Sequence, residues 1–120
     1  MVTRPLISVV DDDESVRESL PDLLKEFGFA AQTFSSAEEF LASESIAETG
    51  CLILDVAMPG MTVQEFLDKA CIAKSRIVLT SAVVEPQAVA QRLGLKHWLA
   101  KPFDPVKLLA VMQSTQTAEQ

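Results

Sequence analysis

Histidine and cysteine are scarce in this sequence, which contains one histidine and two cysteines. A single histidine, His97, cannot build a multi-histidine metal site, and we expect it to be a surface residue. Cys51 is expected to begin a strand and Cys71 to end a helix. We expect both to be buried thiols rather than a disulfide pair. The composition therefore disfavours a multi-histidine metal centre and a disulfide-stabilised domain.

Long apolar runs and basic patches are also missing. No run approaches the roughly 20 apolar residues of a membrane span, and the apolar residues that precede Asp11 are too few for a signal peptide. The net charge is −7, without a basic patch or stripe that could bind nucleic acid. We therefore expect a cytoplasmic protein that contacts neither membrane nor nucleic acid directly.

The chain nevertheless has enough apolar residues for one core. It contains 120 residues, of which 48% are hydrophobic. A chain of this size buries roughly two thirds of the surface that it exposes when unfolded. We expect one domain over residues 1–120 with a polar tail at about 114–120.

Two apolar runs end in carboxylates. Residues 7–10 stop at four consecutive acids, of which Asp11 and Asp12 come first, and the run at 51–55 ends in Asp55. A short apolar run that ends in polar residues is typical of a buried strand. Ligands bind at the carboxyl ends of strands in open α/β sheets. The sequence therefore predicts that these three carboxylates meet at one edge of a sheet.

A hydroxyl and a cation follow two further runs. Residues 76–80 end in Thr80, and Lys101 follows the run at 97–100. We expect both side chains at the same edge as the carboxylates.

Strands and helices are expected to alternate along the chain. This alternation predicts a doubly wound five-stranded parallel sheet with helices on both faces. The expected strands lie at 7–10, 29–34, 51–55, 76–80 and 97–100, and the expected helices at about 16–27, 37–43, 63–71, 86–93 and from 104.

The expected edge combines a cation-binding half with an anion-binding half. Clustered carboxylates repel one another, and a hard divalent ion such as Mg²⁺ relieves that repulsion while also binding phosphate. Lys101 supplies the positive charge that a phosphoryl group requires. The pattern favours a metal-dependent phosphate site over a sugar-cleaving carboxylate pair, in which Lys101 and Thr80 would have no evident role.

Four motifs carry a resemblance to a known family. They are Val-Val-Asp-Asp-Asp at 9–13, Leu-Asp-Val-Ala-Met-Pro-Gly-Met at 54–61, Leu-Thr-Ser-Ala at 79–82 and Trp-Leu-Ala-Lys-Pro-Phe at 98–103. In this order the chain resembles, over nearly its whole length, the receiver domain of two-component response regulators, the CheY-like family. The resemblance implies a flavodoxin-like (βα)5 fold and a phosphoaspartate switch.

The resemblance also implies roles for the residues of the acidic edge. Asp55 matches the phosphoacceptor, Asp12 a direct Mg²⁺ ligand, and Asp11 an acid that acts mainly through water. The backbone carbonyl of Ala57 matches the third protein ligand. Mg²⁺ is therefore the cofactor that the resemblance implies.

Further matches concern the response to phosphorylation. Thr80 matches the switch hydroxyl, Lys101 the cation that pairs with the phosphoryl group, and Trp98 the switch aromatic. Pro102 commonly follows a cis peptide bond in this family. The face formed by residues 86–114 is then expected to change shape and to bind an output domain or protein.

The implied partners are a histidine kinase or phosphotransfer protein that donates the phosphoryl group and a downstream output domain or protein. The resemblance also allows a phosphorylation-dependent homodimer. Such a domain assists its own phosphorylation and dephosphorylation but is not a turnover enzyme acting on a free substrate.

Two departures from the family pattern keep an alternative open. Val63 stands where the family usually has glycine, and a β-branched residue tolerates positive φ poorly, so we expect this loop to take another course. The segment from Asp55 to Thr80 is also short. A binding module of the same fold that signals without phosphorylation is therefore the alternative function.

Two other classes fit the sequence less well. A hydrolase of the haloacid dehalogenase type would need an acid two residues after its nucleophile, where Ala57 stands. A flavin-binding flavodoxin is disfavoured because the four glycines lie outside any phosphate-cradling loop.

Overall fold

The computed structural model describes residues 6–57, 60–70, 72–82, 86–101 and 103–117. The strands form one parallel sheet in the order β2-β1-β3-β4-β5, which is the flavodoxin-like order expected. They are β1 (Leu6–Val10), β2 (Ala30–Phe34), β3 (Thr49–Asp55), β4 (Ile77–Ser81) and β5 (His97–Ala100). The doubly wound five-stranded sheet predicted from the alternating pattern is confirmed.

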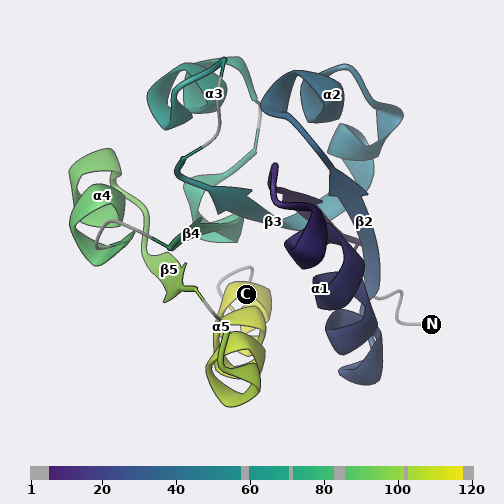
Figure 1. Ribbon diagram of the computed structural model, residues 1–120. Helices are drawn as coiled ribbons and strands as arrows, with labels where there is room; N and C mark the ends of the chain where they lie inside the picture. Colours follow the sequence, from purple (N-terminus) through teal and green to yellow (C-terminus); the bar gives the residue numbers. More distant parts are fainter. Residues whose placement is uncertain (1–5, 58–59, 71, 83–85, 102, 118–120) are drawn as a thin grey trace.

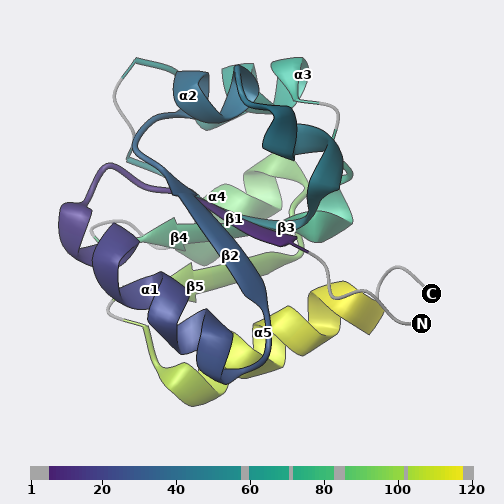
Figure 2. The ribbon, with the colours of Figure 1, turned by 90° about the vertical axis from the view of Figure 1, so that its right-hand side faces the viewer.

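Helices cover both faces of the sheet, as expected for a parallel sheet. They are α1 (Glu14–Glu26), α2 (Ala37–Leu41), α3 (Val63–Lys69), α4 (Pro86–Leu93) and α5 (Pro105–Thr117). In both ribbon views α1 and α5 lie on one side of the sheet and α2 and α3 on the other (Figures 1 and 2). Two short 3₁₀ helices, η1 (Glu44–Glu48) and η2 (Lys74–Arg76), precede β3 and β4 and were not expected.

Two cores result from the period-two alternation of side chains along each strand. In β1, Ile7 and Val9 pack with α1 and α5, whereas Val10 faces the other core. In β3, Ile53 packs with the first group and Leu54 with the second. Both faces of the central strands are therefore largely apolar, and the one polar side chain within β1, Ser8, is buried with its hydroxyl 2.7 Å from that of Thr49.

Local capping fixes where several helices begin and end. The side chain of Asp13 accepts a hydrogen bond from the Ser15 amide at 2.9 Å and caps α1. The side chain of Ser36 likewise accepts from the Glu39 amide and caps α2. Gly28, with a φ of 91°, follows the last turn of α1, as expected for a helix-terminating glycine.

The carboxyl-terminal helix is longer than the sequence predicts. Residues 114–117 belong to α5, so the polar tail expected at about 114–120 is helical over its first four residues. The reason is a contact between distant segments. Thr115 is fully buried, donates its hydroxyl to the Met112 carbonyl at 2.8 Å and lies close to Cys51 of β3.

The predicted buried thiol is confirmed for Cys51. It is a free cysteine inside β3, and burial raises the pKa of its thiol to about 12, with the Thr115 hydrogen bond acting in the opposite direction. Cys71 and Pro102 lie outside the described residues, and so do the expectations made for them. Among the helices described, none has the length and apolar composition required to cross a bilayer.

Candidate functional site

The three carboxylates predicted to meet do lie together. Asp11 and Asp12 follow β1, and Asp55 ends β3, which pairs with β1 in parallel register. One carboxylate oxygen from each of these residues lies within 4.8 Å of the others. Asp11 and Asp55 are buried, whereas Asp12 is exposed. The cluster therefore opens to solvent on the side of Asp12.

Lys101 connects the buried carboxylates. Its Nζ lies 2.6 Å from Oδ2 of Asp11 and 3.4 Å from Oδ2 of Asp55. Its backbone amide donates to the Ser81 carbonyl at 2.9 Å, which continues the pairing of β4 with β5 beyond the end of β5. The side chain thus extends from the end of β5 past β4 to reach β3 and β1.

Asp11 is held by two contacts that sequence reasoning missed. The Asp13 amide donates to Oδ1 of Asp11 at 2.9 Å. The guanidinium of Arg17, one turn into α1, donates to the Asp11 carbonyl at 2.9 Å. The acidic run gave a signal for the first contact, because an Asp side chain commonly accepts from the amide two residues later. The second depends on the position of α1 and has no local signal.

The environment of Asp55 disfavours its charge. Burial is the main cause that raises the pKa of its carboxyl group, and the charge of Asp11 adds to it. Lys101 opposes both effects, as does the Ala57 amide, which donates to Oδ1 of Asp55 at 3.3 Å. The ionised Asp55 is therefore only partly compensated by the groups around it.

Lys101 remains charged in this setting. Burial is the strongest single influence and lowers the pKa of its amine, but the hydrogen bond to Asp11 and the charges of Asp55 and Asp11 together outweigh burial. The net effect raises the pKa of Lys101 above its usual value.

Thr80 lies at the predicted edge but is not bonded to Asp55. It is the register partner of Asp55 across β3 and β4 and is fully buried. Its hydroxyl donates to the Leu54 carbonyl at 3.4 Å, which is long for a bond between oxygens. The Thr80 hydroxyl is therefore only weakly bound in this structure.

Trp98 lies on the edge strand β5 and is half-buried, as expected for an aromatic that covers the core. Like Val89 and Leu93 of α4, it packs against the second core, and α4 lies against β5. The neighbouring His97 is also partly buried; burial lowers the pKa of its imidazole, and the charge of Lys96 adds to this effect. Trp98 thus connects α4 to the sheet.

The loop before α3 takes the course expected from Val63. Among the described residues only glycines have positive φ, and in this loop Gly60 does so at 91°. Val63 instead begins α3, where Thr62 and Glu65 form a capping box. The replacement of glycine by valine is therefore accommodated without backbone strain at that position.

The donor set fits a hard divalent ion. Three carboxylates supply only oxygen atoms, which Mg²⁺ prefers over nitrogen or sulfur, and one side of the cluster is open. The expected third protein ligand, the Ala57 carbonyl, belongs to an exposed residue two positions after Asp55.

Comparisons with known proteins agree with this geometry. The family model described as response regulator receiver domain matches residues 7–113. Among curated relatives, the transcriptional regulatory protein FixJ of Azorhizobium caulinodans is 37% identical over 95% of this chain, which covers 57% of that protein. The chain thus spans less than two thirds of that relative.

Solved structures give the same result. Response regulator StyR superposes with a TM-score of 0.79 and 37% identity, over 98% of this chain and 62% of that one. Chemotaxis response regulator CheY4 of Vibrio cholerae superposes with a TM-score of 0.79 and 29% identity, over 94% of this chain and 99% of that one. Together with the acidic edge and Lys101, these matches show that the chain belongs to the receiver domain family of two-component response regulators.

Proposed function

We propose that this receiver domain accepts a phosphoryl group on Asp55 from a phosphohistidine of a histidine kinase or phosphotransfer protein. The observation that carries the proposal is the position of the Asp55 carboxylate, with two acids on one side and the Lys101 ammonium 3.4 Å away. A nucleophile flanked by a cation site and by a fixed positive charge is what phosphoryl transfer requires.

Mg²⁺ is the proposed cofactor. Asp12 and Asp55 would be its side-chain ligands, Asp11 would act mainly through water, and the Ala57 carbonyl would be the remaining protein ligand. When bound, the ion supplies positive charge that offsets the repulsion among the carboxylates and the charge on the phosphoryl oxygens.

The reaction requires little covalent chemistry from the protein. An oxygen of Asp55 forms a bond to phosphorus as the bond from phosphorus to the donor imidazole nitrogen breaks, and the electron pair leaves with the imidazole. Lys101 would turn from Asp11 toward the transferred group and stabilise its negative charge. The chain contributes position and electrostatics.

The phosphorylated state would then be read through Thr80 and Trp98. Because the bond from the Thr80 hydroxyl to the Leu54 carbonyl is weak, little free energy is lost when the hydroxyl rotates toward a phosphoryl oxygen. Space vacated by Thr80 would allow Trp98 to move inward, and α4 would shift because Trp98 packs against it. The face at 86–114 would thereby present a new surface to an output domain or protein.

The remaining expectations follow from this role. We propose cytoplasmic action and no turnover of a free substrate, with self-catalysed gain and loss of the phosphoryl group. A phosphorylation-dependent homodimer is one form that output could take.

Asp55 is expected to be the sole phosphorylation site. The chain incubated with acetyl phosphate and Mg²⁺ should gain the mass of one phosphoryl group, and the gain should disappear with EDTA. Asp55→Asn should show no gain, whereas Asp22→Asn, which alters an exposed acid on α1, should behave as the unmodified chain. Intact-mass spectrometry measures all four cases. An equal gain in Asp55→Asn would rule out the assignment and favour a module that does not signal through this residue.

Asp55→Asn is also expected to stabilise the metal-free chain. Because burial and Asp11 raise the pKa of Asp55, its ionisation costs stability above the ordinary carboxyl pKa, so the variant should melt a few degrees higher at pH 7 in EDTA. The difference should shrink as the pH falls toward that ordinary value, where the folded chain holds Asp55 neutral. Thermal denaturation followed by circular dichroism tests this, and a lower melting temperature for the variant at pH 7 would contradict it.

Trp98 is expected to report phosphorylation. As the single tryptophan, it should change its emission when beryllofluoride and Mg²⁺ are added together. Thr80→Val should greatly reduce that change while leaving the binding of beryllofluoride, followed by ¹⁹F NMR, in place. Unchanged emission in protein shown to bind beryllofluoride would exclude Trp98 from the switch.

The phosphorylated form is expected to be long-lived. Ala57 and Ala82, two residues after Asp55 and Thr80, have no polar group to orient an attacking water, and both are exposed. Ala57→Asn combined with Ala82→Glu should therefore speed the loss of phosphate at least severalfold, measured by the decay of the phosphorylated mass. Decay at the unmodified rate, or loss from the unmodified chain within seconds, would refute the argument.

A further inference from the structure

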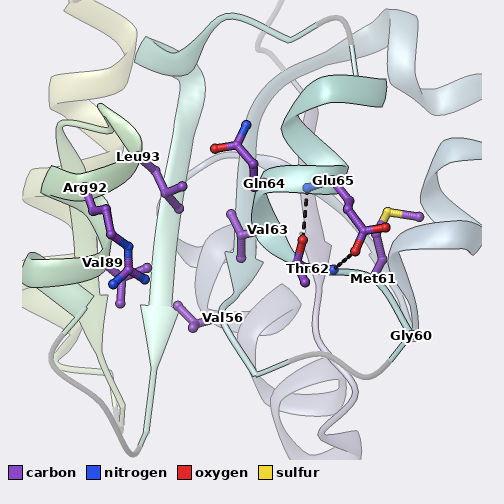
Figure 3. A pocket seen from close by; sticks show the side chains of 10 residues that line it. All are labelled: Val56, Gly60, Met61, Thr62, Val63, Gln64, Glu65, Val89, Arg92 and Leu93. Carbon is purple, nitrogen blue, oxygen red and sulfur yellow. Dashed lines mark hydrogen bonds between the residues drawn. The ribbon is translucent and has the colours of Figure 1, made fainter.

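A cavity lies between the start of α3 and the helix α4. Its volume is about 650 Å³. Figure 3 shows Val89, Arg92 and Leu93 of α4 along one side of the cavity and Thr62 and Glu65 along the other. Val56 and Val63 lie between the two sides. The phosphoryl-transfer chemistry proposed above uses none of these side chains.

The cavity has an apolar floor made of branched side chains. Val56 follows β3, Val63 begins α3, and Val89 and Leu93 come from α4. All four pack against the second core yet are only half-buried, so each keeps apolar surface available on the cavity side. Covering that surface with an apolar ligand would be favourable by the hydrophobic effect.

One cation stands at the edge of this floor. Arg92 is exposed and is the only basic residue among those that line the cavity. Within the part of the chain that the structure describes, no acid pairs with it. A guanidinium in this position can bind a carboxylate through two parallel hydrogen bonds.

The acid on the opposite side is already engaged. Oε1 of Glu65 accepts from the Thr62 amide at 3.1 Å, and the Glu65 amide donates to the Thr62 hydroxyl at 3.1 Å. The hydrogen bond from the Thr62 amide is the main cause that lowers the pKa of Glu65, so this carboxylate is ionised at neutral pH. It would repel an anionic group on its side of the cavity, which leaves Arg92 as the favourable end.

We propose that this cavity binds a small amphipathic carboxylate, with the carboxylate on Arg92 and the apolar body against the valines and Leu93. Three features agree on this class: a volume in the range of small-molecule sites, an apolar floor, and a single positive group with its negative counterpart on the far side. The proposal does not depend on phosphorylation of Asp55.

Octanoate is a suitable probe, and ¹H–¹⁵N spectra of the 120-residue chain would locate it. Saturable shifts are expected at the amides of Val63, Val89 and Leu93. The Val56 amide should respond as well, because the Val56 side chain lines the cavity. This amide donates to the Thr80 carbonyl at 2.9 Å.

Arg92→Gln should weaken octanoate binding roughly tenfold, the effect of one lost hydrogen bond to a charged group. The same substitution should leave the binding of neutral octan-1-ol unchanged. Lys25→Gln, which removes an exposed cation from α1, is the matched control and should bind octanoate as the unmodified chain does. Because Arg92 is exposed, its replacement should not disturb folding, and circular dichroism checks this.

Four outcomes would overturn the proposal. The first two are the absence of a saturable shift with octanoate and shifts confined to other parts of the chain. The third is an equal loss of octanoate affinity in Arg92→Gln and Lys25→Gln, and the fourth is tighter binding of octylamine than of octanoate. The last would assign the polar end to Glu65 and a cationic ligand.

Discussion

The repulsion among three carboxylates at one edge of the sheet is the constraint on which the site depends. Asp11, Asp12 and Asp55 lie together because parallel strands deliver their carboxyl ends to the same place. Burial of two of them intensifies the repulsion, since a low dielectric weakens screening. Lys101 is the only compensating side chain among the described ion pairs, and it reaches both buried acids.

Lys101 compensates the two acids unequally. Its ammonium lies 0.8 Å nearer to Asp11 than to Asp55, the difference between 2.6 and 3.4 Å. Asp11 is further fixed by the Asp13 amide, whereas Asp55 has only a 3.3 Å contact from the Ala57 amide. The raised pKa of Asp55 reflects this imbalance. The less satisfied of the two buried carboxylates is thus the one proposed as the nucleophile, which suits a group that must form a new bond.

Much of this arrangement is predictable because its signals are local. A short apolar run that ends in a polar residue specifies both a strand and the place where its functional side chain emerges, which is why Asp11, Asp55, Thr80 and Lys101 were found. The alternation of these runs with helical segments then fixes the layers of the fold.

The remaining features depend on contacts between distant segments. The last turns of α5 bury Met112 and Thr115, and the bond from Arg17 to the Asp11 carbonyl follows from how α1 lies against the sheet. The 3₁₀ turns are too short to show a periodic pattern. The Thr80 hydroxyl points to the Leu54 carbonyl here and is proposed to turn to a phosphoryl group on Asp55. No sequence pattern encodes which of these two acceptors the hydroxyl binds.

The end of β3 joins the two sites described. Asp55 turns its carboxylate toward the acidic edge, and the next residue, Val56, lines the apolar cavity. Between them the Val56 amide is bonded to the carbonyl of Thr80, whose hydroxyl is the proposed switch. A displacement of Val56 would therefore move the strand end that carries the phosphoacceptor and the carbonyl of its switch residue together. A cavity ligand that displaces Val56 would therefore change the affinity of the acidic edge for its own ligands, and that coupling would be equal in both directions.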